Sequence, residues 1–172
     1  MSTFDLSLRE LKRTPGAKKD FSLQGCFPIE IVTGLISWPA QRYADLTGTL
    51  ESVGDGVLVK GTADVLLEAE CSRCLTVFPM PTQAEFQELF VYPEHQTEYE
   101  AEDVSLIHEE TIDLADLVRD SIILVQPLIP LCQPDCLGLC PSCGAELNTD
   151  PEHGHDDTVD SRWLGLAEWG KM

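Results

Sequence analysis

The sequence predicts an α+β fold with a mainly antiparallel sheet, one strong helix and a cysteine-rich, zinc-binding C-terminal segment. Segments with alternating apolar residues follow one another as far as residue 90, and no helical pattern interrupts them. One amphipathic helical pattern then covers residues 113–125. Strands that precede a helix, without alternating with helices, favour an antiparallel sheet. The composition, 43% hydrophobic and 24% charged over 172 residues, is that of a globular protein with one core.

The N-terminal part of the chain predicts a short strand and a basic loop. Residues 3–6 alternate weakly, which favours an edge strand. Residues 9–19 are polar and contain the turn Pro15-Gly16, so they predict a loop. We therefore expect residues 1–20 to precede the main domain, which we assign to residues 21–148. Its first segment, residues 29–38, is apolar and β-branched, as in β structure.

Two hairpins are predicted in the middle of the chain. Residues 46–53 and a long strand that starts at Val57 flank the turn at residues 54–56. Apolar residues recur at every second position of this strand as far as Ala69. The chain then turns back, and a second alternating pattern, over residues 84–90, predicts a returning strand. Cys71 and Cys74 are thus expected at the tip of a hairpin.

A helix and a tail complete the predicted fold. Asp113 can cap the helix, and Pro127 ends it. Residues 94–110 are acidic and lack a clear period, which predicts a solvated loop. After an extended stretch over residues 127–131, the cysteine-rich segment follows. Residues 149–172 predict an acidic, histidine-containing tail that closes with a short helix around Trp163–Trp169.

The net charge of −19 restricts the possible partners. An acidic surface repels phosphate, so extensive direct binding of RNA is disfavoured. Five of the eleven basic residues lie in the first twenty positions, so any basic face belongs to the N-terminal arm. A basic protein is a better direct partner than bare nucleic acid, although a charge excess also serves solubility alone.

The cysteines and the apolar segments indicate the compartment. No segment has the composition of a signal peptide, and no apolar run is long enough to span a bilayer. We therefore expect a cytoplasmic protein. Its seven cysteines would stay reduced there, so metal ligation is a better explanation for them than a disulfide framework.

Two Cys-x-x-Cys pairs predict a structural zinc site, because this spacing lets one turn present two sulfurs to one ion. Our first choice of ligands is Cys71, Cys74, Cys140 and Cys143, which would join the hairpin to the C-terminal segment. Four other residues are second choices: Cys132, Cys136, His153 and His155. The eight candidates can fill two sites or compete for one. Two further groupings stay open: the four C-terminal cysteines together, or Cys140 and Cys143 with the two histidines.

Each group of candidate ligands also has a simpler role without a metal. Cys71 and Cys74 can be buried as small apolar side chains, and histidines beside acids often belong to a solvated tail. Cys26 stands alone in the sequence and is interpreted as a core residue.

Two classes of enzyme share parts of this cysteine and histidine pattern. The full histidine, glutamate and cysteine pattern of zinc deaminases is incomplete here. A dithiol redox protein needs its cysteine pair at a helix N-terminus, whereas here a strand leads into Cys71. We therefore expect no enzymatic activity and no catalytic residues.

Several motifs resemble the YceD family. Residues 70–75 (Glu-Cys-Ser-Arg-Cys-Leu) are similar to the first motif of that family, and residues 127–144 are similar to the second. Weaker similarities occur at residues 13–16, 86–90 and 160–163. Ser161 stands where a proline is common, and His153-Gly-His155 stands where many members carry Cys-x-Cys. The acidic tail with its histidines resembles the actinobacterial branch.

The resemblance implies a role in the synthesis, processing or stability of large-subunit (23S) ribosomal RNA. It implies no catalytic residue. Large-subunit precursors are the expected partners, with a basic ribosomal protein as a candidate for the direct contact. The sequence therefore predicts a ribosome assembly factor. The alternatives are a generic zinc-binding interaction module or a dithiol redox protein.

Overall fold

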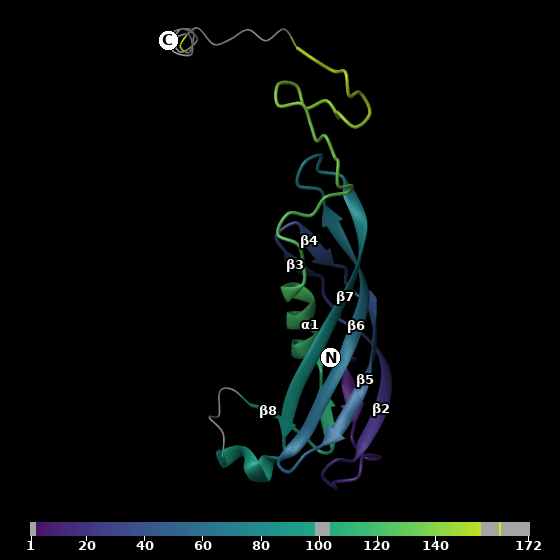
Figure 1. The fold of residues 1–172 in the computed structure, drawn as a ribbon, viewed down its shortest axis with the longest axis vertical. Helices are drawn as coiled ribbons and strands as arrows, with labels where there is room; N and C mark the ends of the chain where they lie inside the picture. The colour runs from purple at the N-terminus through teal and green to yellow at the C-terminus, as the bar shows by residue number, and fades with distance from the viewer. Residues whose placement is uncertain (1–2, 99–103, 156–161, 163–172) are drawn as a thin grey trace.

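The computed structural model describes residues 3–98, 104–155 and 162. A long, twisted antiparallel sheet forms the body of the molecule, and helix α1 (Ala115–Leu124) lies beside strand β7 (Val77–Val91) (Figure 1). The segment that follows α1 passes the tip of the hairpin formed by β6 (Gly56–Glu70) and β7, and it extends beyond the end of the sheet (Figure 1). That end of the molecule carries the cysteine clusters.

Nine strands are assigned among the described residues, together with the helix and one 3-10 turn, η1 (Pro93–Glu98). Two of the strands, β6 and β7, are far longer than the rest and form the central hairpin. The remaining bounds are β1 (Asp5–Ser7), β2 (Lys18–Cys26), β3 (Ile31–Thr33), β4 (Ile36–Trp38), β5 (Tyr43–Ser52), β6 (Gly56–Glu70), β8 (Ser105–Leu106) and β9 (Thr111–Asp113).

Strand β6 is the centre of the sheet. β7 pairs with it along its whole length, whereas its other edge is shared by β5 and then β4. β2 and β3 continue the sheet outward from β5 and β4. β8 adds a short parallel pairing to the far end of β7, and β1 pairs with β9 in a separate two-stranded sheet. All the pairings except β7–β8 are antiparallel.

One hydrophobic core joins the sheet, the helix and the N-terminal segment. Apolar residues at alternate positions of β6, from Val57 to Ala69, face this core, as their period of two predicts. Ile122 and Val118 of α1 are also buried in it. Phe4 is fully buried against Phe27 and Trp38, and its ring lies where a side chain on Gly25 would be. Burial on this scale is the main stabilising contribution to the sheet.

Much of this architecture agrees with the sequence. The antiparallel sheet, the β5–β6 and β6–β7 hairpins and the single helix are confirmed. The predicted cap is one residue off, because the N-cap is Leu114, which makes no side-chain cap hydrogen bond; the Asp113 carboxylate nevertheless accepts a hydrogen bond from the N–H of Ala115, the first residue of the helix (2.8 Å). The turn that ends β6 also lies where it was predicted, so Cys71 and Cys74 are at the hairpin tip.

Some elements differ from the predictions. The interpretation of residues 18 and 19 as part of a loop was wrong, because β2 starts at Lys18 and crosses the boundary placed after residue 20. The loop predicted over residues 94–110 instead contains most of η1 and all of β8 in its described parts. The closing helix predicted around Trp163–Trp169 lies outside the described residues. No described helix has the length and apolar character needed to cross a bilayer.

Candidate metal centres

The hairpin tip folds into a turn that presents Cys71 and Cys74 on the same side. The Cys71 N–H donates to the Thr76 carbonyl (3.0 Å), and the Leu75 N–H donates to the Cys71 carbonyl (2.9 Å). Leu75 has a φ of +62°, which an L-residue adopts at a cost of about 1–2 kcal/mol. Cys71 and Cys74 are three residues apart in the sequence, and the tight turn directs their side chains to one point, as binding to a single metal ion requires.

The segment after α1 is fixed across this tip by hydrogen bonds. The N–H and the hydroxyl of Ser72 donate to the Pro130 carbonyl, at 2.9 and 3.0 Å. The Arg73 guanidinium donates to the Cys136 carbonyl (2.7 Å), and the Leu139 N–H donates to the Arg73 carbonyl (3.2 Å). Two segments that are distant in the sequence are thereby held in register. This docking carries Cys132 and Cys136 onto the cysteines of the hairpin tip.

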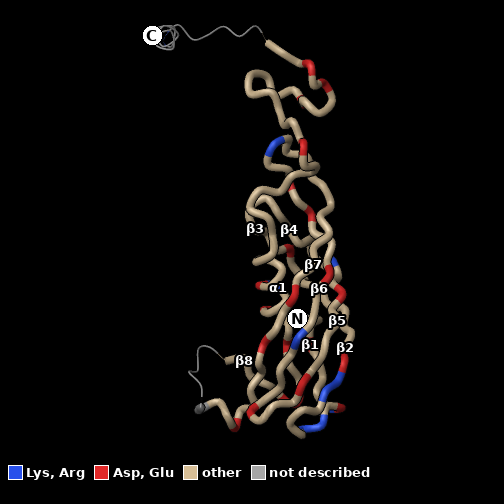
Figure 2. The backbone as a smooth tube through the Cα atoms, viewed as in Figure 1, with Lys and Arg blue, Asp and Glu red and all other residues tan. Residues whose placement is uncertain are grey.

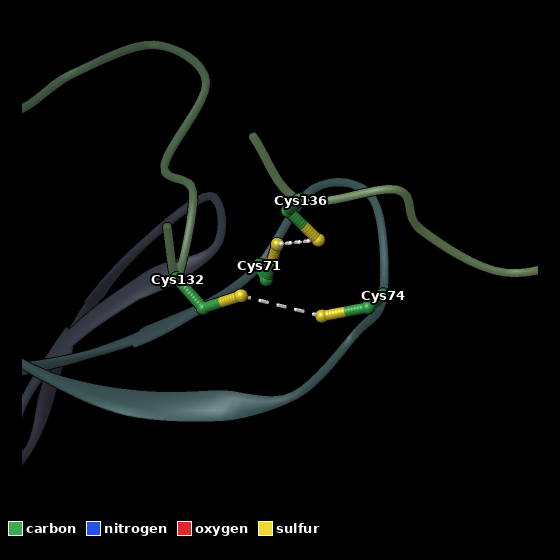
Figure 3. A group of neighbouring side chains, drawn as sticks. All are labelled: Cys71, Cys74, Cys132 and Cys136. Atoms are coloured by element: carbon green, nitrogen blue, oxygen red, sulfur yellow. Dashed lines mark hydrogen bonds between the residues drawn. The ribbon is translucent and has the colours of Figure 1, made fainter. Parts of the chain in front are cut away.

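The four cysteines point toward one another (Figure 3). The Cys71 and Cys136 Sγ atoms are 3.8 Å apart, and the Cys74 and Cys132 Sγ atoms are 3.6 Å apart. All four sulfurs lie within 4.8 Å of one another. Zinc–sulfur bonds of about 2.3 Å in a tetrahedron place neighbouring sulfurs about 3.8 Å apart. This cluster, which we call the clamp, therefore fits a zinc ion and is far too wide for disulfides.

The pKa values in the clamp show the effect of crowding four thiols together. Burial alone would raise the pKa of Cys71, but hydrogen bonds from the backbone, first of all at Cys74, lower it to about 6. Hydrogen bonding to the side chain and backbone of Thr76 lowers the pKa of Cys74. Burial and then the neighbouring thiols raise the pKa of Cys132 to about 12. Cys71 and Cys74 thus lose their protons more easily than an ordinary thiol, whereas Cys132 keeps its proton. A bound dication would favour the thiolate form of each ligand.

A second cluster lies farther along the same segment. The Cys143 Sγ is 3.1 Å from the His153 Nε2 and 3.2 Å from the His155 Nε2. The two Nε2 atoms are 3.1 Å apart, and Cys140 completes a group whose ligand atoms all lie within 4.8 Å. In a tetrahedral site with zinc–nitrogen and zinc–sulfur bonds of about 2.0–2.3 Å, two ligand nitrogens, or a nitrogen and a sulfur, lie about 3.3–3.6 Å apart. We call this group the outer cluster.

The outer cluster is built on a turn like that at the hairpin tip. The Cys140 N–H donates to the Ala145 carbonyl and the Gly144 N–H donates to the Cys140 carbonyl, both at 2.8 Å. Gly144 has a φ of +76°, in the left-handed region that glycine adopts without steric cost. Hydrogen bonds from the backbone at Ser142 and then Cys143 lower the pKa of Cys140 to about 7. Unlike the clamp, this group is largely open to water, because Cys143 and His155 are exposed.

The structure groups the eight candidates differently from our first choice. Cys71 and Cys74 do not meet Cys140 and Cys143 but are joined by Cys132 and Cys136. The reason is that the segment after α1 docks on the backbone of Ser72 and on Arg73. This docking places Cys132 and Cys136 at the hairpin tip, and Cys140 comes only after the chain has passed it. The chain turns at Gly138, whose φ is +80°, and leaves the tip. The alternative in which the two histidines join Cys140 and Cys143 agrees with the observed grouping.

Two supporting residues were not identified from the sequence. The Asn148 side-chain amide donates to the Cys136 Sγ (3.3 Å), and its carbonyl oxygen accepts from the Leu137 N–H (2.8 Å). Arg73 holds the backbone of Cys136, as described above. Hydrogen bonds of this kind orient metal ligands, but a lone asparagine in a loop gives no signal in one sequence. Cys26 is buried in β2 and belongs to neither cluster.

This geometry defines a small α+β protein with two four-ligand clusters, and comparison with known proteins gives its family. The family described as "Large ribosomal RNA subunit accumulation protein YceD" matches residues 59–168. An uncharacterized protein of Mycobacterium tuberculosis is 37% identical over 169 residues, which are 97% of this chain and 81% of that protein. The chain therefore belongs to the YceD family.

More distant relatives agree with this assignment. The uncharacterized protein YlbN of Bacillus subtilis is 30% identical over 99 residues, covering 57% of each chain. A chloroplastic protein of Zea mays, named large ribosomal RNA subunit accumulation protein YCED homolog 1, is 46% identical over 41 residues. That match covers 24% of this chain and 14% of the maize protein. No solved structure matches the chain significantly.

Proposed function

We propose that this chain is a non-enzymatic, zinc-clamped factor that supports the accumulation of 23S ribosomal RNA in the bacterial cytoplasm. The observation that carries the proposal is the extent of the family match. Residues 59–168 include nearly all of the central hairpin, the helix and all eight candidate ligands of the clamp and the outer cluster. The clusters thus belong to the part of the chain that is similar to a family described by its effect on this RNA.

Zinc in the clamp has a structural role in this proposal. Its four cysteines come from two segments that are linked only through more than fifty residues, so one ion ties the hairpin tip to the chain after α1. Three of these cysteines are buried. Four protein ligands complete a tetrahedron and leave no position for a substrate or an activated water, unlike a catalytic zinc site. The ion supplies rigidity at the end of the sheet.

A redox role for the thiols fits the structure less well. A reactive dithiol usually has one cysteine at a helix N-terminus, where the peptide dipoles stabilise its thiolate. Here Cys71 directly follows the strand β6, and Cys74 belongs to a turn. The lowered pKa of Cys71 suits a metal ligand equally well, because zinc binds the thiolate. We therefore assign these thiols to metal binding.

The direct partner in this proposal is a basic protein of the nascent large subunit. Asp and Glu residues occur along the strands and on α1, whereas Lys and Arg residues are few along the backbone (Figure 2). With a net charge of −19, the chain is repelled by bare RNA and attracted to basic ribosomal proteins. The factor would then protect the RNA indirectly, by helping a protein to assemble on it.

Sedimentation and RNA measurements test this function together. Tagged native protein should migrate with large-subunit precursors in a sucrose gradient of cell extract. Cells that lack the protein should hold less 23S RNA relative to 16S RNA, and the native gene should restore the ratio. An unchanged ratio together with migration only among free proteins would rule out the proposed role and favour a zinc-binding interaction module that acts outside the ribosome.

A further inference from the structure

The groove between β7 and α1 combines acidic walls with a stretch of strand edge that no described strand pairs with. It is lined on one side by residues 85–88 of β7 and on the other by α1 from Asp116 to Leu124, with Ser105 of β8 also in contact. Its volume is about 470 Å³. We infer that it receives an extended, basic segment of a protein partner as an added strand on β7. This inference rests on the proposed function, since it names how the basic partner is bound.

The free edge of β7 has a defined pattern of backbone groups. Its register with β6 is continuous from Val77 to Val91, without a bulge. Pro79 and Pro81 have no N–H to give to β6, so odd-numbered residues of β7 direct their backbone groups away from β6. The Ile107 N–H, on the β8 side, donates to the Val91 carbonyl (3.0 Å), which confirms that assignment.

Among the described residues, three consecutive odd positions and the N–H of a fourth are therefore unpaired. β8 occupies the edge only opposite Phe90 and Val91. The outward N–H and carbonyl groups between the prolines and β8 form no hydrogen bond with the backbone of any described residue. They belong to Gln83, Glu85 and Gln87. Leu89 keeps only its outward N–H, because the parallel pairing of Phe90 with Ser105 directs the Ser105 N–H to the Leu89 carbonyl. An open edge of this length is a template for another strand.

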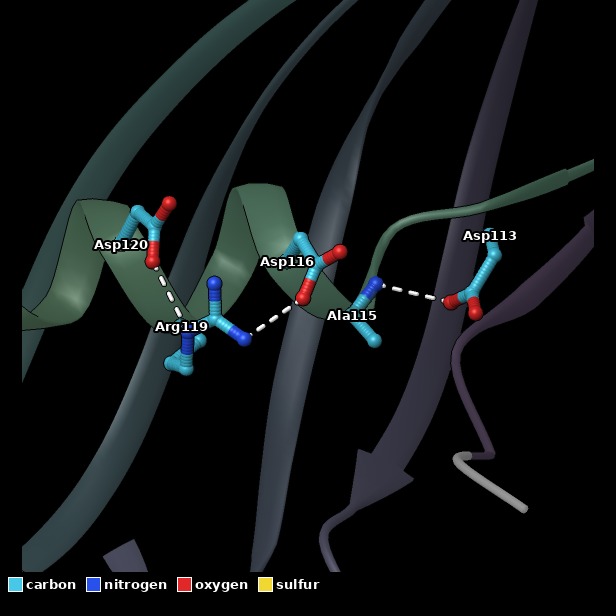
Figure 4. A network of polar contacts seen from close by, with 5 residues as sticks. All are labelled: Asp113, Ala115, Asp116, Arg119 and Asp120. Atoms are coloured by element: carbon cyan, nitrogen blue, oxygen red, sulfur yellow. Dashed lines mark hydrogen bonds and ion pairs between the residues drawn. The ribbon is translucent and has the colours of Figure 1, made fainter. Parts of the chain in front are cut away.

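The charge of the groove selects a basic occupant. Two carboxylates line the β7 side, Glu85 and Glu88, and two line the helix, Asp116 and Asp120. Arg119 pairs with both aspartates, at 2.6 and 2.8 Å (Figure 4). Four carboxylates against one guanidinium leave three net negative charges along the groove. An RNA backbone would be repelled, whereas Lys and Arg side chains would be attracted.

An exposed apolar patch extends the groove at the C-terminal end of α1. Leu124 lines the groove and is 83% exposed, and Leu128, four residues later, is 99% exposed. Val125 and Ile129 are exposed as well. Apolar side chains gathered in this way commonly mark a binding surface. The preferred segment therefore has basic residues along the strand and an apolar residue that can cover this patch.

A synthetic peptide tests the inference directly. The probe is a capped peptide of alternating lysine and valine, about as long as residues 82–89. Bound as a strand, it should slow hydrogen exchange of the Gln83, Glu85, Gln87 and Leu89 amides at least tenfold, as read by NMR of the whole protein. A glutamate–valine peptide should not bind. Binding of the basic peptide without protection of these amides would overturn the inference.

Matched variants separate the edge from the rest of the fold. Gln87→Pro removes an outward N–H that β6 does not use, so it should weaken peptide binding at least tenfold. Gln87→Ala keeps that N–H and should bind within about twofold of the native protein. If the proline disturbs folding, the double variant Glu88→Gln with Asp120→Asn tests the charge without changing the backbone. Equal affinity of that double variant and the native protein would also refute the inference.

Other occupants of the edge give distinct results. A second copy of the chain would protect the same amides without peptide, increasingly at higher protein concentration, and this would overturn the inference. So would protection of these amides by an RNA oligonucleotide. In the sucrose gradient, if native protein and Gln87→Pro both migrate with precursors, the groove assignment fails while the proposed function stands. If native protein does not migrate with them, the function fails, and the peptide experiment still tests the groove.

Discussion

The clearest consequence of two separate clusters is that equivalent substitutions should have unequal effects on stability. Cys71→Ser removes a ligand from the clamp, and Cys143→Ser removes one from the outer cluster. The clamp connects the sheet to a distant segment, whereas every ligand of the outer cluster lies after α1. Unfolding of the sheet should therefore respond strongly to the first substitution and little to the second.

The loop that the clamp closes gives the size of the effect. Cys71 and Cys136 are 65 residues apart in the sequence. Closing a loop of that length removes chain entropy worth about 4 kcal/mol at 25 °C, by the relation used for disulfides. For a chain of this size, such a change in the free energy of unfolding lowers Tm by about 8–16 °C. Loss of the outer cluster releases only a local loop and should change the Tm of the sheet by less than about 2 °C.

Thermal unfolding followed by far-UV circular dichroism measures this difference, because the signal comes mainly from the sheet. Both variants are compared with zinc-loaded native protein at equal concentration. Native protein treated with a strong chelator should unfold like Cys71→Ser. Equal losses of Tm in the two variants, or an unchanged Tm in Cys71→Ser, would refute the reasoning that only the clamp fastens the sheet.

Three further predictions concern individual residues. Because its raised pKa keeps Cys132 protonated at neutral pH, zinc binding to the clamp should release at least one proton, so affinity should rise at least about tenfold from pH 7 to pH 8. Competition with a chromophoric chelator measures this, and a pH-independent affinity would contradict it. Gly25→Ala places a methyl group against the Phe4 ring and should cost about 1–3 kcal/mol in urea unfolding, whereas Gly54→Ala, where the space is open, should cost little. Leu75→Gly should raise stability by about 0.5–1 kcal/mol, since glycine accepts the left-handed turn without strain, and a loss of stability would show that the exposed leucine contributes to packing.

The sequence predicted those parts of the fold whose signals are local. The period of two in β6 and the three- and four-residue spacing in α1 each depend on neighbouring residues. β2 was missed because Lys18 and Lys19 introduce it, and their charges resemble the loop before them. The pairing of β1 with β9 and of β7 with β8 joins segments remote in the sequence, where no local pattern specifies the partner.

The candidate site shows the same division between local and remote information. The ligand types and the turn at Gly144 follow from spacing and from glycine chemistry, so all eight candidates were identified. Their grouping depends on backbone hydrogen bonds that dock Pro130 on Ser72 and Leu139 on Arg73. Nothing in the spacing of the cysteines encodes that docking. The two Cys-x-x-Cys pairs were predicted to share one ion. The docked backbone instead brings Cys71 and Cys74 together with Cys132 and Cys136, which are four residues apart in the sequence.

Counting zinc ions in paired variants by native mass spectrometry tests the central claim most directly. Native protein should carry two zinc ions per chain. The double variant Cys71→Ser with Cys136→Ser should carry one, because both residues serve the clamp, and Cys71→Ser with Cys140→Ser should carry none. If the second double variant kept one ion while the first lost both, the cysteines would be paired across the clusters and the grouping described above would be contradicted.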